Sequence, residues 1–199
     1  MISQEYTLTY YNTTVKSFAA STLNVPFTDL QSTFLSNLPP RSHILDFGCG
    51  SGRDTKYFLA QGQQVDAIDG SEELCKIASE YTGIPVKQML FEELDAVEEY
   101  DGIWACASIL HVAKAQLPEI LQKMTMATKK GGIIYTSFKY GDFEGEKNGR
   151  FFTYLTESSF EELIKDIPEL QIEKMWTSAD VRADRADENW LNIILRRQP

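Results

Sequence analysis

Residues 44–62 read ILDFGCGSGRDTKYFLAQG, and this stretch decides the fold of the 199-residue chain. Its apolar start predicts a short buried strand, and the segment that ends near Leu59 predicts a helix. The turn between them carries Gly48, Gly50 and Gly52. Glycine adopts positive φ angles and lets a ligand approach the backbone closely, so this turn is a candidate ligand site.

A carboxylate returns to the same turn from the next strand. This strand is expected over residues 64–68 and ends on Asp69, 19 residues after Gly50. A strand–helix–strand unit of this length brings Asp69 beside the glycine turn, where it can accept hydrogen bonds from ribose hydroxyls. The spacing therefore predicts a site for a cofactor that contains a nucleoside.

The glycine spacing distinguishes between classes of cofactor. A dinucleotide fingerprint needs glycine or alanine at its sixth position, where this chain has Arg53. That residue disfavours a nicotinamide-dependent oxidoreductase, which we keep as one alternative. The sequence DFGCGSG at 46–52 instead resembles the glycine-rich segment of class I S-adenosylmethionine-dependent methyltransferases.

The resemblance covers most of residues 40–140, about half of the chain. Residues 100–112 resemble the fourth strand of the family and its following loop, and residues 129–138 resemble the fifth strand. The resemblance implies a Rossmann-like α/β fold with a seven-stranded, mostly parallel sheet, helices on both faces and an antiparallel last strand. It also implies S-adenosylmethionine as the cofactor and methyl transfer as the reaction.

The resemblance also implies a set of cofactor-binding residues. Asp46 would meet the α-amino group and the sulfonium, and Gly70 would lie against the adenine. Many relatives carry an aspartate after the third strand, where this chain has Leu90. Either Glu92 or the backbone around Phe91 would then read the adenine. The implied residues are Asp46, Gly48, Gly50, Gly52, Asp69, Gly70, Phe91, Glu92 and Cys106.

The acceptor is expected beyond the carboxyl ends of the strands. His111 follows the fourth strand, and it is either a general base, an acceptor ligand or a histidine that fixes a loop by hydrogen bonding. Tyr11, in the N-terminal segment, is the second catalytic candidate. Lys139, Tyr140 and Arg150 are the candidates for binding the acceptor, because a cationic and aromatic set suits an acidic or aromatic molecule.

Composition and charge restrict the partners. The net charge of −10 disfavours nucleic acid, whose phosphates attract basic residues, so we expect a small-molecule acceptor. No apolar run reaches the ~18 residues of a membrane span. The three cysteines form no metal-binding pair. The expectations are therefore no membrane partner, no metal, a cytoplasmic location, and a monomer or homodimer.

The chain is expected to form one domain over residues 1–199. Residues 1–40 would form a helical N-terminal cap, and residues 41–140 the cofactor-binding core. Residues 141–199 would supply an acceptor-side loop, a helix that opens with a capping box at 158–161, and two last strands. This C-terminal part resembles a small bacterial, type 11/12-like group of class I methyltransferases, which implies no particular acceptor.

Two functions are weighed besides the oxidoreductase. The first is S-adenosylmethionine-dependent methyl transfer to a small molecule by in-line displacement, in which the protein chiefly positions the two reactants. The second is a non-catalytic module that binds S-adenosylmethionine or S-adenosylhomocysteine. The module would bind both ligands and turn over no acceptor.

Overall fold

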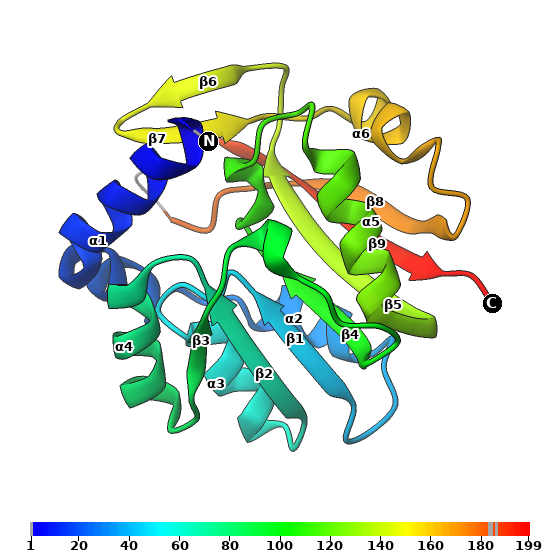
Figure 1. Cartoon of the computed structure of the whole chain (residues 1–199), viewed down its shortest axis with the longest axis horizontal. Helices are drawn as coiled ribbons and strands as arrows, with labels where there is room; N and C mark the ends of the chain where they lie inside the picture. The colour runs from blue at the N-terminus through cyan, green and yellow to red at the C-terminus, as the bar shows by residue number, and fades with distance from the viewer. Residues whose placement is uncertain (1, 183–184, 186) are drawn as a thin grey trace.

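The computed structural model describes residues 2–182, 185 and 187–199, and its centre is a seven-stranded sheet (Figure 1). The strand order is β3-β2-β1-β4-β5-β9-β8. The parallel strands are β1 (His43–Phe47), β2 (Gln64–Asp69), β3 (Val86–Gln88), β4 (Tyr100–Ala105) and β5 (Thr128–Lys139). The last strand, β9 (Asn189–Arg197), lies between β5 and β8 (Leu170–Ala179) and is antiparallel to both. The predicted sheet is therefore confirmed.

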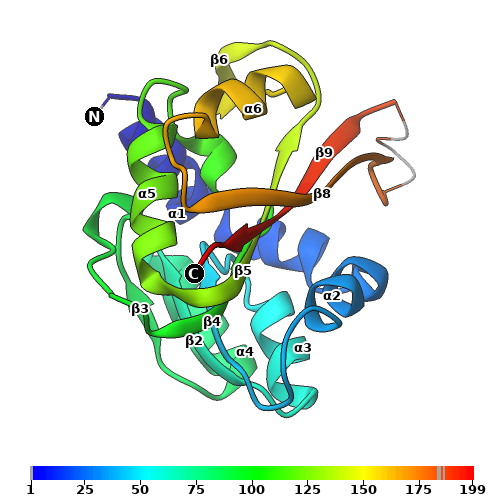
Figure 2. The same cartoon turned by 90° about the vertical axis from the view of Figure 1, so that its right-hand side faces the viewer.

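Helices cover both faces of the sheet (Figure 2), and side chains that alternate along the strands divide the core between these two layers. Leu45 and Ile103 belong to the cluster with α5 (Leu117–Ala127) and α6 (Glu157–Ile164). Ile44 and Trp104 belong to the cluster with α2 (Thr28–Leu35) and α3 (Arg53–Ala60). Because successive strand residues point to opposite faces, each apolar run supplies both layers. Helix α4 (Glu72–Thr82) packs near α3.

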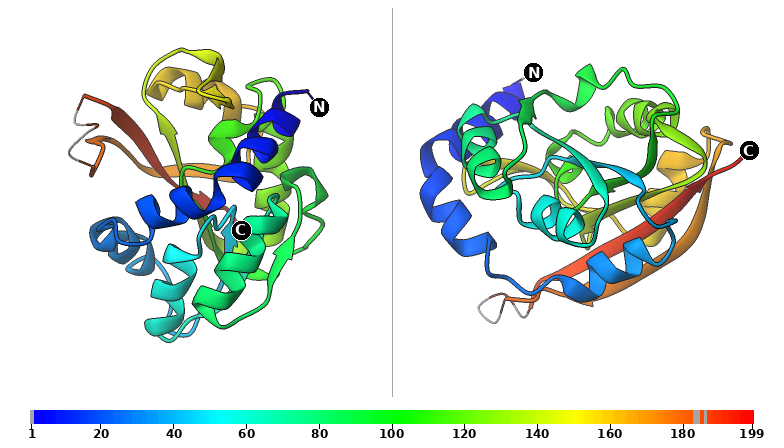
Figure 3. Two further views of the ribbon diagram at one scale, coloured as in Figure 1. Left: turned by 90° about the vertical axis from the view of Figure 1, so that its left-hand side faces the viewer. Right: turned by 90° about the horizontal axis from the view of Figure 1, so that it is seen from below.

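Helix α1 (Ile2–Thr22) joins parts of the molecule that are distant in the sequence. It packs against α4, against the 3-10 turn Ile109–His111 and against β7 (Arg150–Thr153), as the two views of Figure 3 show. Asn12 accepts a hydrogen bond from the Ser71 hydroxyl at 2.6 Å, and Thr7 accepts one from the Phe151 amide at 3.0 Å. None of the described helices combines the length and apolar character that a membrane span needs.

Two local expectations were wrong. The segment after β5 contains a hairpin instead of a plain loop, with β6 (Glu144–Lys147) antiparallel to β7. Its turn is Asn148-Gly149, and both residues have positive φ, which is the backbone that a tight hairpin needs. Helix α6 begins two residues earlier than expected, because the Thr156 side chain accepts the cap hydrogen bond from the Ser159 amide.

Candidate active site

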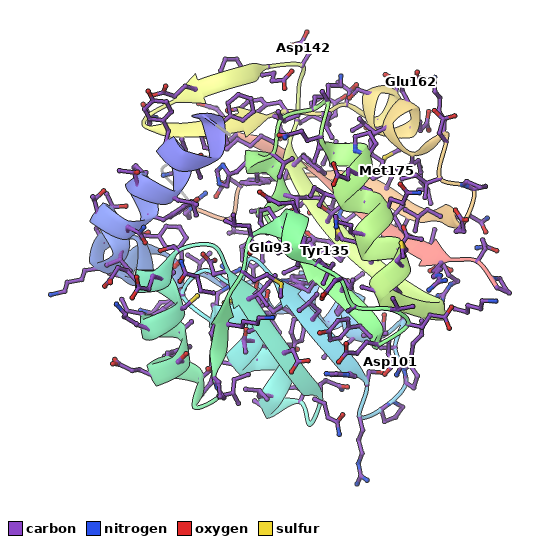
Figure 4. The ribbon with its side chains drawn as sticks, viewed as in Figure 1. Glu93, Asp101, Tyr135, Asp142, Glu162 and Met175 are labelled. Atoms are coloured by element: carbon purple, nitrogen blue, oxygen red, sulfur yellow. The ribbon has the colours of Figure 1, made fainter. Side chains whose placement is uncertain are left out.

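A cavity of about 230 Å³ lies at the carboxyl ends of the parallel strands. Its walls come from the glycine turn after β1, the loop after β4, helix α1, the end of β5 and the segment after β8. Tyr135 on β5 lines it, and Figure 4 places this residue near the centre of the molecule. The predicted residues in this wall are Tyr11, Gly48, Gly50, Asp69, Gly70, Phe91, Cys106, His111, Lys139 and Arg150.

Asp69 is held by the backbone of the two turns that surround it. Its Oδ2 accepts a hydrogen bond from the Gly50 amide at 2.9 Å, and its Oδ1 accepts one from the Ser71 amide at 2.8 Å. Burial raises the pKa of Asp69, and the two amide hydrogen bonds oppose that shift. Each carboxylate oxygen still has a lone pair available, so Asp69 can accept hydrogen bonds from a diol in the cavity.

The glycine turn has no room for side chains at its first position. Gly48 has a φ of +84°, and a Cβ added there would lie 2.5 Å from the Ser108 Cβ and 3.2 Å from the Phe91 ring. A Cβ at Gly50 would approach the Phe18 ring to 3.3 Å. The turn therefore brings bare backbone to the cavity wall.

We predict that Gly48→Ala destabilises the protein more than Gly62→Ala does. Both glycines have positive φ, which costs an alanine about 1–2 kcal/mol. Nothing lies within 4 Å of a Cβ at Gly62, whereas Gly48→Ala also clashes with Ser108. The free energy of unfolding, measured by urea titration, reports the difference. Equal losses in the two variants would show that the turn accommodates a side chain.

Four predicted site residues do not belong to the described wall of the cavity: Asp46, Gly52, Glu92 and Tyr140. Asp46 is buried behind the turn and accepts a 2.5 Å hydrogen bond from the Thr55 hydroxyl. Gly52 serves helix packing, since a Cβ there would lie 2.8 Å from the Thr82 side chain. In the turn Phe91–Glu93 the Phe91 ring faces the cavity in place of Glu92. Tyr140 is 40% exposed and donates to Glu157.

The position of Asp46 predicts a pH dependence of stability. Burial and the neighbouring Asp54 carboxylate raise the pKa of Asp46 to about 8, from its ordinary value of about 4. The folded protein thus keeps a proton that the unfolded chain releases, so the free energy of unfolding falls as pH rises between these values. Asp46→Asn should lose less stability than the wild type between pH 6 and pH 9, as measured by urea unfolding. The exposed Asp66→Asn is the control, and it should follow the wild type.

Tyr11 and His111 form a hydrogen-bonded pair in the wall of the cavity. The His111 Nδ1 lies 2.6 Å from the Phe151 carbonyl oxygen, which can only accept, so Nδ1 carries the proton. Nε2 then accepts from the Tyr11 hydroxyl at 2.9 Å. Burial is the main cause that lowers the pKa of His111 to about 4, with smaller contributions from Arg150 and Lys139. His111 is therefore a neutral imidazole with both ring nitrogens in hydrogen bonds.

The predicted acceptor-binding cations are surrounded by rings. The Arg150 guanidinium carbon lies 4.6 Å from the centre of the Tyr10 ring and 5.0 Å from that of Phe152. The Lys139 ammonium group is 5.7 Å from the centre of the Trp190 ring and forms an ion pair with Glu188. Cations are attracted to aromatic faces, so the rings help to hold both side chains at the cavity.

Asp54 is a site residue that the sequence did not reveal. This buried carboxylate lines the cavity and pairs with Arg53, whose Nε and Nη2 lie 2.8 and 2.9 Å from its two oxygens. It also accepts from the Gln31 amide at 2.7 Å and from the Trp104 indole at 2.9 Å. Gln31 and Trp104 are 23 and 50 positions away from Asp54, so no local pattern could have indicated the network.

Comparison with known proteins agrees with this geometry. Residues 44–132 match the family model described as a methyltransferase domain. Residues 44–132 therefore carry the sequence pattern of a methyltransferase domain. The match includes the glycine turn, Asp69 and the loop with His111, and the resemblance to class I S-adenosylmethionine-dependent methyltransferases is thereby confirmed.

The methyltransferase domain has sequence relatives that are much longer. It is 31% identical over 108 residues to the ubiquinone biosynthesis O-methyltransferase of Rickettsia conorii, which covers 52% of this chain and 37% of that protein. The chain spans little more than a third of the length of the curated relatives that it matches. The sequence likeness is therefore confined to part of those proteins.

Solved structures share the fold of nearly the whole chain. The 1,6-didemethyltoxoflavin-N1-methyltransferase of Burkholderia thailandensis, with 1,6-didemethyltoxoflavin and S-adenosylhomocysteine bound, aligns with a TM-score of 0.76. The alignment covers 96% of this chain and 87% of that one at 20% identity. The [4+2]-cyclase SpnF aligns with a TM-score of 0.68 at 14% identity, over 85% of this chain and 84% of that one. At such identities the likeness shows the fold alone.

Proposed function

We propose that this methyltransferase domain transfers the methyl group of S-adenosylmethionine to a small-molecule acceptor. The observation that carries the proposal is the buried Asp69 carboxylate, which two backbone amides hold at the cavity wall beside Gly48 and Gly50. A carboxylate in this place suits the ribose diol of a nucleoside cofactor.

The other residues of this half of the cavity fit the same cofactor. Gly48 leaves a space that a Cβ would fill, and the Ser108 hydroxyl is buried without a partner among the described residues, so it is free to bond a ligand. Leu90, Phe91 and Gly70 line the part of the wall near Asp69. This apolar lining supports binding of the adenine ring by packing and by backbone contacts. In this proposal Glu92 does not bind the adenine.

The bound cofactor would supply a methyl group on a positively charged sulfur. The protein then needs to hold an acceptor in line with that group and to exclude water. We assign this positioning to Tyr11, Lys139 and Arg150, which line the other half of the cavity. His111 acts through Tyr11 in this proposal, because its hydrogen bonds fix the orientation of the phenol.

The names of the relatives support a small organic acceptor, since one acts in ubiquinone biosynthesis and another binds 1,6-didemethyltoxoflavin. We further propose that the protein acts without nucleic acid, as a monomer or homodimer. The cysteines Cys49, Cys75 and Cys106 are all free, which supports a reducing compartment such as the cytoplasm.

Calorimetric titration with S-adenosylmethionine, S-adenosylhomocysteine and NAD tests the cofactor. We expect micromolar binding of the first two and none of NAD. An acceptor screen that follows S-adenosylhomocysteine formation then tests the reaction. Binding without turnover of any acceptor would favour the non-catalytic module. The [4+2]-cyclase shows that a protein of this fold need not be named a methyltransferase. Binding of NAD alone would overturn the assignment of the glycine turn.

A further inference from the structure

We propose that the acceptor is a planar aromatic acid, which binds as its anion with the negative charge on the Arg150 guanidinium. The proposal rests on the methyl transfer proposed above and names the class of molecule that the other half of the cavity takes. Four features carry it: a cation without a described counter-charge, the charge of this end of the cavity, its aromatic walls and the hydrogen bonds of His111.

Arg150 is a cation with one unsatisfied donor and no described counter-charge. Its guanidinium lines the cavity between the rings of Tyr10, Tyr11 and Phe152, and its Nε is buried without a hydrogen-bond partner in the described part of the chain. No described carboxylate forms an ion pair with it. Arg150 is half-buried at the cavity wall, and a cation that no described carboxylate neutralises favours an anion in the cavity. The guanidinium edge matches two oxygens of one planar anion.

The charge of this end of the cavity favours the same class of ligand. Four basic side chains line it, namely Lys139, Arg150, Arg182 and Arg185. Glu188 pairs with Lys139 and Asp180 pairs with Arg182, whereas no described carboxylate pairs with Arg150. The whole chain has a net charge of −10, so this end of the cavity is positive although the protein as a whole is negative. A local excess of one sign raises the local concentration of ligands of the other sign.

The walls are aromatic where the charge is positive. Tyr11, Phe152 and Trp190 line the cavity around Lys139 and Arg150. Flat rings favour flat ligands, because stacked or edge-on rings bury apolar surface and gain contact energy beyond that burial. The combination of rings and cations therefore selects an aromatic anion over an aliphatic one.

The hydrogen bonds of His111 indicate that the acceptor arrives already ionised. Its Nδ1–H donates to the Phe151 carbonyl and its Nε2 accepts from Tyr11, so no nitrogen is left for a proton of the acceptor. The charged groups that face it, Arg150 and Lys139, are both cations and oppose a further positive charge. An anion needs no base: it supplies the electron pair for the new bond to the methyl carbon. The carbon–sulfur pair returns to sulfur, and the charges of anion and sulfonium cancel.

Matched probes on the protein saturated with S-adenosylhomocysteine test this inference. The probes are nicotinate against nicotinamide for the carboxylates, and 4-nitrophenolate against 4-nitroaniline for the acidic ring hydroxyls. Calorimetry at pH 8 should show at least one acid that binds about 10- to 100-fold more tightly than its neutral partner, as expected for a charge-assisted hydrogen bond. The pair that shows the larger ratio tells whether the anion is a carboxylate or a phenolate.

Variants of Arg150 locate the effect. Arg150→Gln should reduce the ratio of acid to neutral affinity to about one, and Arg150→Lys should retain part of it. Lys130→Gln removes the same charge from an exposed position outside the cavity wall and should keep the wild-type ratio. Unchanged binding of S-adenosylhomocysteine confirms that each variant is folded.

Three results would overturn the inference. One is a neutral probe that binds as tightly as its acid, and another is a full acid preference in Arg150→Gln. The third is the absence of binding by both acids while S-adenosylhomocysteine still binds, which removes the acid class and leaves the cofactor assignment intact. Loss of S-adenosylhomocysteine binding by the wild type would instead refute the proposed function itself.

Discussion

Asp69→Ala is expected to weaken binding of S-adenosylhomocysteine by about 100-fold or more. The wild-type carboxylate is held by the amides of Gly50 and Ser71 and faces the cavity, where two ribose hydroxyls would donate to it. Each hydrogen bond to a charged partner contributes about 1.5–3 kcal/mol, so removal of the acceptor loses both at once. The alanine also leaves two amides without their partner. Isothermal titration calorimetry measures the change.

The matched control for this experiment lies on the same strand. Asp66 is three residues earlier, its side chain is 52% exposed, and it contacts His43 instead of the cavity. Asp66→Ala should bind S-adenosylhomocysteine as the wild type does. Asp69→Asn keeps one acceptor oxygen and should fall between the wild type and Asp69→Ala. If Asp69→Ala binds as tightly as Asp66→Ala, the ribose does not lie at Asp69.

Asp54→Ala is expected to lower the free energy of unfolding by about 3–5 kcal/mol, the range measured when one member of a buried ion pair is removed. The carboxylate accepts hydrogen bonds from Arg53, Gln31 and Trp104, and all three donors would lose their partner together. The Arg53 guanidinium would keep its stacking on the Phe27 ring, at 3.8 Å from the ring centre, but not its counter-charge. Urea unfolding followed by circular dichroism measures the loss.

Asp142→Ala is the control for Asp54→Ala, because Asp142 is exposed on the connection between β5 and β6 at the edge of the molecule (Figure 4). A surface change of this kind should alter stability by less than about 0.5 kcal/mol. Asp54→Asn keeps the volume but brings an amide against the donors of Arg53 or Trp104, so it should also destabilise the protein. A loss below 1 kcal/mol in Asp54→Ala would show that the donors find other partners or water.

The local part of the fold could be predicted from the sequence, because its signals lie within one strand–turn–helix unit. The glycines at 48 and 50, together with the acid at 69, fixed the course of the chain around the cavity, and alternation of apolar residues explains the two-layered core. The hairpin at Asn148-Gly149 was equally local. The dipeptide Asn148-Gly149 is itself a hairpin signal, so the sequence contained this information, although the segment was expected to be a loop.

The rest depended on contacts between distant segments. Asp46 resembles a cofactor ligand in the sequence, but Thr55, nine residues later, turns its carboxylate into the interior. The rings around Arg150 come from α1 and β7, which are more than 100 residues apart. No pattern within a short stretch of sequence indicates such pairs, because they depend on how helix α1 packs against β7. The acceptor half of the cavity is made of contacts of this kind.

The stacking of Trp104 gives the protein an internal optical probe. Its indole lies 4.1 Å from the Tyr135 ring and donates to Asp54, so its emission depends on a dry and intact core. Trp190 lines the cavity itself, beside Lys139. One tryptophan therefore reports unfolding while the other reports the arrival of an aromatic molecule. The third tryptophan, Trp176, stays in place, so comparing Trp104→Phe and Trp190→Phe with the wild type assigns each signal, and ligand entry and folding can then be timed without a label.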